Sequence, residues 1–275
     1  METYFSDRRV TVPNGTDPTR ATPGESTAPV IVLSYPYSGA HLVQRILTHH
    51  SDLAPTAGTG IVPMCEAVAA IWTRIDGRPG TALSRLAVTS IRALVTTQLT
   101  IILASAGKRR WCELATAGPS AAQTFLRIFP AARYVCVHRA FTDVISATIT
   151  AQPWGLAGSA MSRYTDRYTG DSVATAAAYW ASATEQLLAF ETANPQAAVR
   201  VRYEDVVADA ENALENVRIF LGLDQQTRHE LPPGFTEPTA RDAESGYPQV
   251  PLEMIPAELR KRIDLLHEQL SYPAG

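Results

Sequence analysis

The sequence predicts an α/β fold in which helices cover both faces of a central, mostly parallel sheet. Apolar, β-branched runs of the kind found in strands buried on both faces recur along the chain. A helical segment follows each run, and such alternation is typical of parallel sheets, because a crossover between parallel strands needs a helix. With 275 residues, the chain is long enough to bury a full hydrophobic core.

The first strand–turn–helix unit begins with the apolar run VIVLS at residues 30–34. A turn over 35–39 leads into a predicted helix over 40–50, where Leu42, Val43 and Ile46 share one face. Further strands are predicted over 109–114, 133–138 and 197–203. Further helices are predicted over 119–129, 141–151, 172–193 with Asp171 as N-cap, 211–221 and 256–270, and the region 52–108 is expected to be largely helical.

The domain organisation follows from composition. Residues 1–28 are rich in Pro, Gly and Thr and bury little apolar surface, which predicts a flexible N-terminal tail. Residues 29–275 are expected to form a single domain, in which 223–255 is a long surface segment rich in Pro and Gly.

Charge and hydropathy exclude several classes of protein. The 24 basic and 27 acidic residues give a net charge of −3, which argues against a nucleic-acid binder or a protein of anionic membranes. The first residues, METYFSDRRV, do not form a signal peptide, and the apolar stretch 93–107 is too short and too polar to span a bilayer. We therefore expect a soluble cytoplasmic protein.

The three cysteines, Cys65, Cys112 and Cys136, are widely spaced, and no cysteine or histidine cluster has metal-ligand spacing. They are expected to be buried thiols in a reducing compartment, and no metal is predicted. Only Lys108 and Lys261 among the 24 basic residues are lysines, so an anion site must be built mainly from arginine and backbone N–H groups.

The turn after the first predicted strand is a candidate anion site. Ligands of open parallel sheets bind outside the carboxyl ends of the strands, where helix N-termini present free N–H groups. Gly39 would let the backbone approach an anion, and Ser38 can donate its hydroxyl. The lysine of a GxxxxGK[ST] loop is missing, which argues against an ordinary ATPase or kinase. A plain strand–helix turn is the alternative.

Four segments in order carry a resemblance to a known family: VLSYPYSGAHLVQRIL, RIFPAARYVCVHRAFTDVISA, VRVRYEDVVADAENALENVRIFLGLD and the helix from Pro256 to Tyr272. Together they resemble the sulfotransferases, which have a P-loop NTPase-like fold. The resemblance covers about residues 29–275. It implies transfer of a sulfuryl group from 3′-phosphoadenosine 5′-phosphosulfate (PAPS) to a hydroxyl or amine, with no metal.

The resemblance also implies which residues bind the co-substrate. Tyr37, Ser38, Gly39, Ala40 and His41 would wrap the 5′-phosphosulfate. Arg139 would bind the 3′-phosphate, for which a planar guanidinium is suited, with Ser146 as a further contact. The alternative for Arg139 is a surface ion pair with Asp143, and Glu204 and Asp205 are expected to be structural.

The sequence departs from the family pattern at several of these positions. Tyr37 stands where the family has a lysine, and Ala40 where it has a threonine. The expected serine falls on Ala147, while Ser146 is one residue early, which is a rotation of about 100° on a helix. Leu114 replaces a positive charge after Glu113. These losses would weaken co-substrate binding unless other groups replace them.

Two residues are candidates for the catalytic base. His41 follows the phosphosulfate loop, and imidazole can take up a proton near neutral pH. Glu113 ends a predicted strand where related bacterial enzymes carry an acidic residue, and Glu66 is a weaker choice. A structural role is the alternative for each. The cluster Trp154, Arg163, Tyr164, Arg167 and Tyr168 is expected either to cover an acceptor pocket, with guanidiniums for an anionic acceptor or the nucleotide, or to form an ordinary surface helix.

Two functions remain open. The first is a PAPS-dependent sulfotransferase acting on a small metabolite, free or carrier-bound, which activates it for later elimination or cyclisation. The second is a degenerate, non-catalytic subunit that supports an active sulfotransferase. The expected partners are the acceptor and, in a homo- or hetero-oligomer, another sulfotransferase-like subunit, with no nucleic acid and no membrane.

Overall fold

The fold is that of a computed structural model, which describes residues 28–57, 59–75, 83–116, 118–156, 158–223 and 254–272. Of the predicted N-terminal tail, only Ala28 belongs to these residues, and most of the predicted surface segment 223–255 also lies outside them.

The centre of the molecule is a parallel sheet of five strands, which confirms the predicted fold class. In chain order the strands are β1 (Val30–Leu33), β2 (Leu53–Ala57), β3 (Arg110–Ala115), β4 (Arg133–His138) and β5 (Ala198–Arg202). In space their order is β2-β3-β1-β4-β5. Leu33 at the end of β1 pairs with Ala115 on one side and Cys136 on the other. The carboxyl ends of the central strands therefore meet at one edge of the sheet.

Strand β2 was not predicted, because the region 52–108 was expected to be largely helical. Its sequence, LAPTA, contains a proline and no β-branched run. Pro55 is tolerated because β2 lies at the edge of the sheet and pairs only with β3. The pairing with β3, more than 50 residues away, creates this strand rather than its local propensity.

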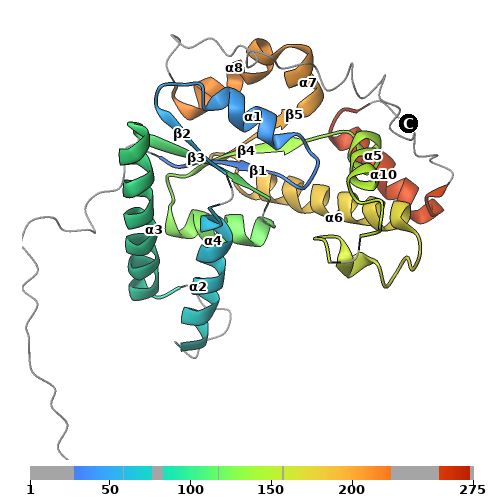
Figure 1. The fold of residues 1–275 in the computed structure, drawn as a ribbon, viewed down its shortest axis with the longest axis horizontal. Helices are drawn as coiled ribbons and strands as arrows, with labels where there is room; N and C mark the ends of the chain where they lie inside the picture. The colour runs from blue at the N-terminus through green and yellow to red at the C-terminus, as the bar shows by residue number, and fades with distance from the viewer. Residues whose placement is uncertain are drawn as a thin grey trace, which may run out of the picture.

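Helices cover both faces of the sheet (Figure 1). One face carries α1 (Ala40–Leu47), α7 (Tyr203–Ala208) and α8 (Ala210–Leu221). The other face carries α2 (Ile61–Ile75), α3 (Arg85–Ala106), α4 (Pro119–Ile128) and α6 (Ser172–Ala193). Helices α5 (Phe141–Ala151) and α10 (Ala257–Gln269) pack against α6, and a short 3-10 turn, η2 (Ser162–Tyr164), lies between α5 and α6.

Side chains alternate between these two faces along each strand. On β1, Val30 and Val32 belong to the core under α1 and α8, whereas Ile31 and Leu33 belong to the core under α4 and α6. All four are almost completely buried, as expected for a strand covered on both faces. The predicted N-cap of α6 is confirmed, since Asp171 accepts a hydrogen bond of 2.8 Å from the N–H of Ala174.

Helix α3 contains the apolar stretch that was judged too short to span a bilayer. The helix is longer than that stretch, and an 18-residue window within it has a mean hydropathy of 1.6, with 22% of the window buried. By length and composition alone it would be able to cross a membrane. In this fold it packs against the domain through a stripe at helical spacing, formed by Ala87, Ile91, Val95 and Leu99.

Candidate functional site

The loop from Ser34 to Gly39 connects β1 to α1 at the carboxyl edge of the sheet. Gly39 is the N-cap of α1, with φ 80°, and it offers no side chain to cap the helix. The first turn of α1 contains no acidic residue that would offset the positive end of the helix dipole. These features are compatible with an anion at this helix start, and anion binding there stays a prediction.

The glycine at position 39 is explained by packing as well as by its positive φ. A Cβ atom there would lie 2.1 Å from Cδ2 of Tyr203, whose ring fills the space beside the glycine. The guanidinium carbon of Arg139 lies 4.4 Å from the centroid of the same ring. Tyr203, from the start of α7, thus joins the first loop to Arg139.

Arg139 follows β4 directly, and its side chain is largely buried. Its Nη1 donates to the carbonyl oxygen of Tyr37 at 3.2 Å, so the guanidinium reaches the first loop. Its Nε also lies 3.8 Å from a carboxylate oxygen of Asp143, one turn further on. The ion pair that the sequence offered as an alternative therefore exists, and it is compatible with a position beside the loop.

The backbone of Arg139 is held from the opposite face of the sheet. The Tyr35 hydroxyl lies 3.2 Å from both the N–H and the carbonyl oxygen of Arg139, and Trp180 donates its indole N–H to that oxygen at 3.2 Å. Burial raises the pKa of Tyr35 to about 12, so the hydroxyl keeps its proton. These contacts fix the position at which the Arg139 side chain leaves the sheet.

The loop residues Tyr37 and Ser38 are bound within the protein. Tyr37 has φ 67°, a left-handed conformation that costs about 1–2 kcal/mol for a residue with a Cβ. Its hydroxyl accepts a hydrogen bond of 3.1 Å from Nε2 of Gln152, at the end of α5. Ser38 is buried, and its hydroxyl forms a hydrogen bond with that of Ser34. The hydroxyls of Tyr37 and Ser38 are therefore both engaged in hydrogen bonds within the protein.

The other predicted binding residues lie on the two flanking helices. Ala40 is buried and His41 is exposed in the first turn of α1. Ser146 is half-buried on α5. The structure thus brings the loop 37–41 together with Arg139, while the contribution of Ser146 stays a prediction.

Glu113 lies on β3 and is almost completely buried. Its two carboxylate oxygens accept hydrogen bonds of 2.6 Å from the hydroxyls of Thr56 and Thr59, which belong to β2 and to the segment before α2. Burial raises the pKa of Glu113, and these hydrogen bonds partly oppose the shift. The contacts tie β3 to the segment before α2, and a catalytic role for Glu113 stays a prediction.

The segment Arg202–Asp205 contacts neighbouring elements at the carboxyl edge of the sheet, in keeping with the structural role expected for its acidic residues. Glu204 accepts hydrogen bonds of 2.8 Å from the N–H of Ala140, at the start of α5, and from the hydroxyl of Tyr272. Asp205 lies 3.7 Å from Nε of Arg202. Glu204 thus caps α5 rather than its own helix.

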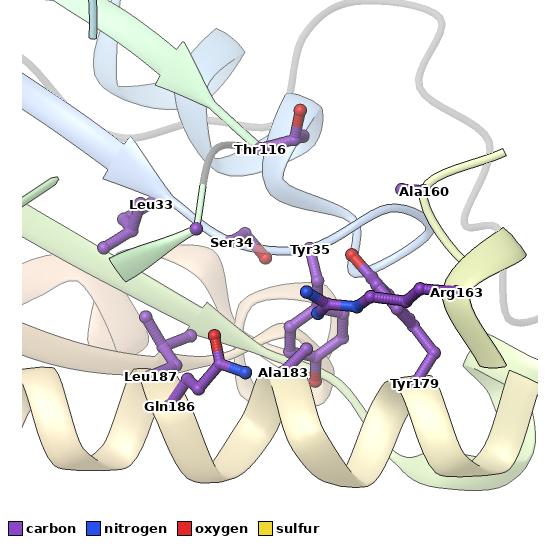
Figure 2. Close-up of a pocket in the computed structure, with 11 residues that line it drawn as sticks. Leu33, Ser34, Tyr35, Thr116, Ala160, Arg163, Tyr179, Ala183, Gln186 and Leu187 are labelled. Carbon is purple, nitrogen blue, oxygen red and sulfur yellow. The ribbon is translucent and has the colours of Figure 1, made fainter. Parts of the chain in front are cut away.

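A cavity of about 220 Å³ lies on the α6 side of the first loop. Figure 2 shows side chains from the end of β1, from the segment after β3 and from α6 around it, with Arg163 extending in from the η2 turn. Neither His41 nor Glu113 belongs to its lining. The lining is formed by Leu33, Ser34, Tyr35, Thr116, Gly118, Ala160, Arg163, Tyr179, Ala183, Gln186 and Leu187.

Arg163 was predicted from the sequence as a possible cover of an acceptor pocket, but the lining residues of α6 were not predicted. Tyr179, Ala183 and Gln186 are spaced by three or four residues, which places them on one helical face. The same spacing is typical of an ordinary core stripe, so the pattern alone does not indicate that this face lines a cavity. Trp180 was missed for a similar reason, since its contact with Arg139 spans 41 residues of chain.

Potential metal ligands and cysteines were compared among the residues that the structure describes. No group of three or more His, Cys, Asp or Glu side chains there could hold a metal ion. Cys65, Cys112 and Cys136 are buried and free, and burial raises the pKa of Cys65 and of Cys112 to about 12. These thiols behave as small apolar core residues.

Comparison with known proteins agrees with this geometry. The model of the sulfotransferase family matches residues 29–227. Among solved structures, the chain is similar to the sulfotransferase domain of the curacin biosynthetic pathway, with 17% identity and a TM-score of 0.59 over 90% of this chain and 99% of that one. A search of curated proteins found no match.

Two further structures show the same fold. The sulfotransferase domain of the olefin synthase from Synechococcus PCC 7002 is 16% identical, with a TM-score of 0.56 over 90% of this chain and 97% of that one. A sulfotransferase from Alicyclobacillus acidocaldarius is 10% identical, with a TM-score of 0.51 over 90% of this chain and 96% of that one. Since the family model spans most of the chain, from the first strand to the end of α8, this protein belongs to the sulfotransferase family.

Proposed function

We propose that this protein transfers a sulfuryl group from PAPS to a hydroxyl or amine of a small acceptor, free or carrier-bound. One observation carries the proposal: the Arg139 guanidinium reaches the carbonyl of Tyr37, in the loop that begins α1. A fixed positive charge thus lies beside the loop that leads into a helix N-terminus, and these two groups suit a ligand with two separated anionic groups.

The residues present fit such a co-substrate in part. Arg139 would hold the 3′-phosphate, and the backbone of 37–41 at the start of α1 would hold the 5′-phosphosulfate. Ser38 would contribute its backbone, because its hydroxyl is bound to Ser34. The family's loop lysine is replaced by Tyr37, whose hydroxyl is bound to Gln152. Charge stabilisation would therefore depend on N–H groups and arginine.

The co-substrate supplies an activated sulfur: the acceptor oxygen or nitrogen bonds to it, the bond from sulfur to the 5′-phosphate oxygen breaks, and 3′-phosphoadenosine 5′-phosphate (PAP) leaves. The acceptor's proton passes to a base, for which His41 is our candidate because it follows the phosphosulfate loop; it is exposed in the first turn of α1 and would act at the mouth of the cavity, not from its lining. The cavity beside Ser34 and Tyr35 would hold the acceptor next to the loop, since transfer needs both substrates in contact.

Binding of PAP tests this proposal. We expect micromolar affinity by isothermal titration calorimetry, weakened at least about tenfold by Arg139→Ala, as for the loss of charged hydrogen bonds. Arg133→Ala is the matched control, because Arg133 lies at the opposite end of β4 and should leave the affinity unchanged. Absence of PAP binding, or equal affinity of the Arg139→Ala variant, would refute the proposal.

The second candidate is a non-catalytic subunit that supports an active sulfotransferase. It is favoured by the inward hydrogen bonds of Tyr37 and Ser38, which take two loop side chains away from a ligand. This candidate predicts no PAP binding by the isolated chain and recovery of binding on addition of a sulfotransferase-like partner.

We further propose that the reaction takes place in the cytoplasm and prepares its acceptor for elimination or cyclisation, because a sulfate ester is a good leaving group. The free, buried state of all three cysteines supports a reducing compartment. The similar domains of the curacin pathway and of an olefin synthase belong to biosynthetic systems, which supports a biosynthetic acceptor.

A further inference from the structure

The cavity lies on the α6 face of the sheet and borders the first loop, whereas helix α1 lies on the other face. Leu33 and Tyr35 point toward α6 and line the cavity, while α1 and Tyr203 belong to the core on the other face. Neither Arg139 nor any residue of the loop 37–41 lines the cavity. The cavity therefore adjoins the first loop through Ser34 and Tyr35, while the residues that would hold the nucleotide lie beside it and not in its lining.

The charge that lines the cavity is positive only. Of the lining residues that the structure describes, Arg163 alone carries a charge. Its guanidinium carbon lies 5.0 Å from the centroid of the Tyr164 ring, and it makes no ion pair with a carboxylate in the described chain. Figure 2 shows the extended Arg163 side chain reaching from the η2 turn into the cavity, toward the end of β1.

The remaining lining divides into an apolar part and neutral polar groups. Leu33, Ala183 and Leu187 form apolar wall, whereas Thr116, Tyr179 and Gln186 offer hydrogen-bonding groups without charge. Burial raises the pKa of Tyr179, although the positive charge of Arg163 partly opposes this shift, so its hydroxyl can act as a donor at neutral pH. A ligand with an apolar body and one negative group would satisfy this lining.

The volume limits the size of that ligand. The cavity measures about 220 Å³. Benzene is held by an engineered cavity of about 150 Å³, and pockets for drug-sized ligands begin at about 300 Å³. The space thus suits a compound of roughly ten non-hydrogen atoms.

We infer that the cavity binds the acceptor as a small anion, a carboxylate that also carries the hydroxyl or amine to be sulfated, and that Arg163 recognises its negative charge. This inference rests on the proposed function for the identity of the ligand as acceptor. A guanidinium binds a carboxylate through two parallel hydrogen bonds, which a neutral amide of the same shape cannot accept in the same way.

Competitive binding to the full chain, measured by saturation-transfer NMR, tests the inference with matched probe pairs. The pairs are 4-hydroxybenzoate with 4-hydroxybenzamide and 4-hydroxybutyrate with 4-hydroxybutyramide, which differ in charge and hardly in shape. We expect the wild type to bind the better of the two carboxylates about tenfold more tightly than its amide. Arg163→Ala should abolish the preference, and Arg163→Lys should keep part of it.

Arg167→Ala is the matched control. Arg167 lies on the same segment and against the ring of the tyrosine that follows it, with 5.5 Å between its guanidinium carbon and the Tyr168 centroid, but it does not line the cavity. This variant should keep the wild-type preference. Equal binding of carboxylate and amide, a preference that survives Arg163→Ala, or no binding of any probe at millimolar concentration would overturn the inference.

The two proposals fail in different ways. If PAP binds through Arg139 while no carboxylate is preferred, the sulfotransferase proposal stands and the inference about the acceptor is wrong. If a carboxylate is preferred through Arg163 while PAP does not bind, the cavity is an anion-binding site of a protein that does not use PAPS, and the proposed function is wrong.

Discussion

The contact between Gly39 and Tyr203 gives the sharpest prediction about this fold. In Gly39→Ala, the new methyl group would lie 2.1 Å from one ring atom of Tyr203 and 2.2 Å from another, so the ring must move. Such overpacking costs about 1–3 kcal/mol. The left-handed φ of 80° adds about 1–2 kcal/mol for a residue with a Cβ. We expect the free energy of unfolding to fall by about 2–5 kcal/mol.

Urea denaturation of a double-mutant cycle separates the two causes. In a Tyr203→Ala background, Gly39→Ala should cost only the backbone strain of about 1–2 kcal/mol, because the ring is gone. Gly107→Ala is the control for strain alone, since Gly107 has φ 61° and no atom within 4 Å of an added Cβ. If Gly39→Ala costs the same with and without Tyr203, the ring contact does not determine the choice of glycine.

Two further predictions concern pH. Burial raises the pKa of Glu113, so the folded state disfavours its charged form, and wild-type stability should fall as pH rises above the unfolded value of about 4.3. Glu113→Gln should therefore be more stable than the wild type at neutral pH and lose this advantage below about pH 4 in urea denaturation; equal stability at neutral pH would contradict the shift. The ring of His267 packs against Trp180, and neither of its nitrogens has a hydrogen-bond partner among the described residues. Burial lowers the pKa of His267, so the folded state disfavours the charged imidazole. The free energy of unfolding should therefore fall as pH drops below about 6.5. Thermal unfolding of His267→Leu should show a flatter pH dependence in that range, and an unchanged slope would refute the assignment.

Much of the fold was predictable because local pattern and tertiary environment agree. The run RYVCVH forms β4 over the predicted residues, and α6 begins directly after the predicted cap, Asp171. Strand β2 was missed because LAPTA has little strand propensity of its own and depends on pairing with β3. Sequence pattern reports local preference, and it fails where a distant partner decides.

The candidate site was likewise predictable only in part. The motif order identified the loop 37–41 and Arg139, and the structure brings them together through the Tyr37 carbonyl. The sequence did not show that Tyr203 fills the space beside Gly39. It also did not show that two threonines would surround Glu113, because these contacts join residues more than 50 positions apart.

The cavity and the groups that would hold the nucleotide come largely from different elements, and this has a consequence for how such a protein can change. The cavity takes most of its selective groups from α6 and η2, while the loop and Arg139 come from the ends of β1 and β4. Substitutions at Tyr179 or Gln186 can therefore alter the choice of acceptor and leave the nucleotide contacts in place. Single substitutions in the cavity lining can therefore change the acceptor. Tyr35 is the position least free to vary, because it lines the cavity and also contacts the backbone of Arg139.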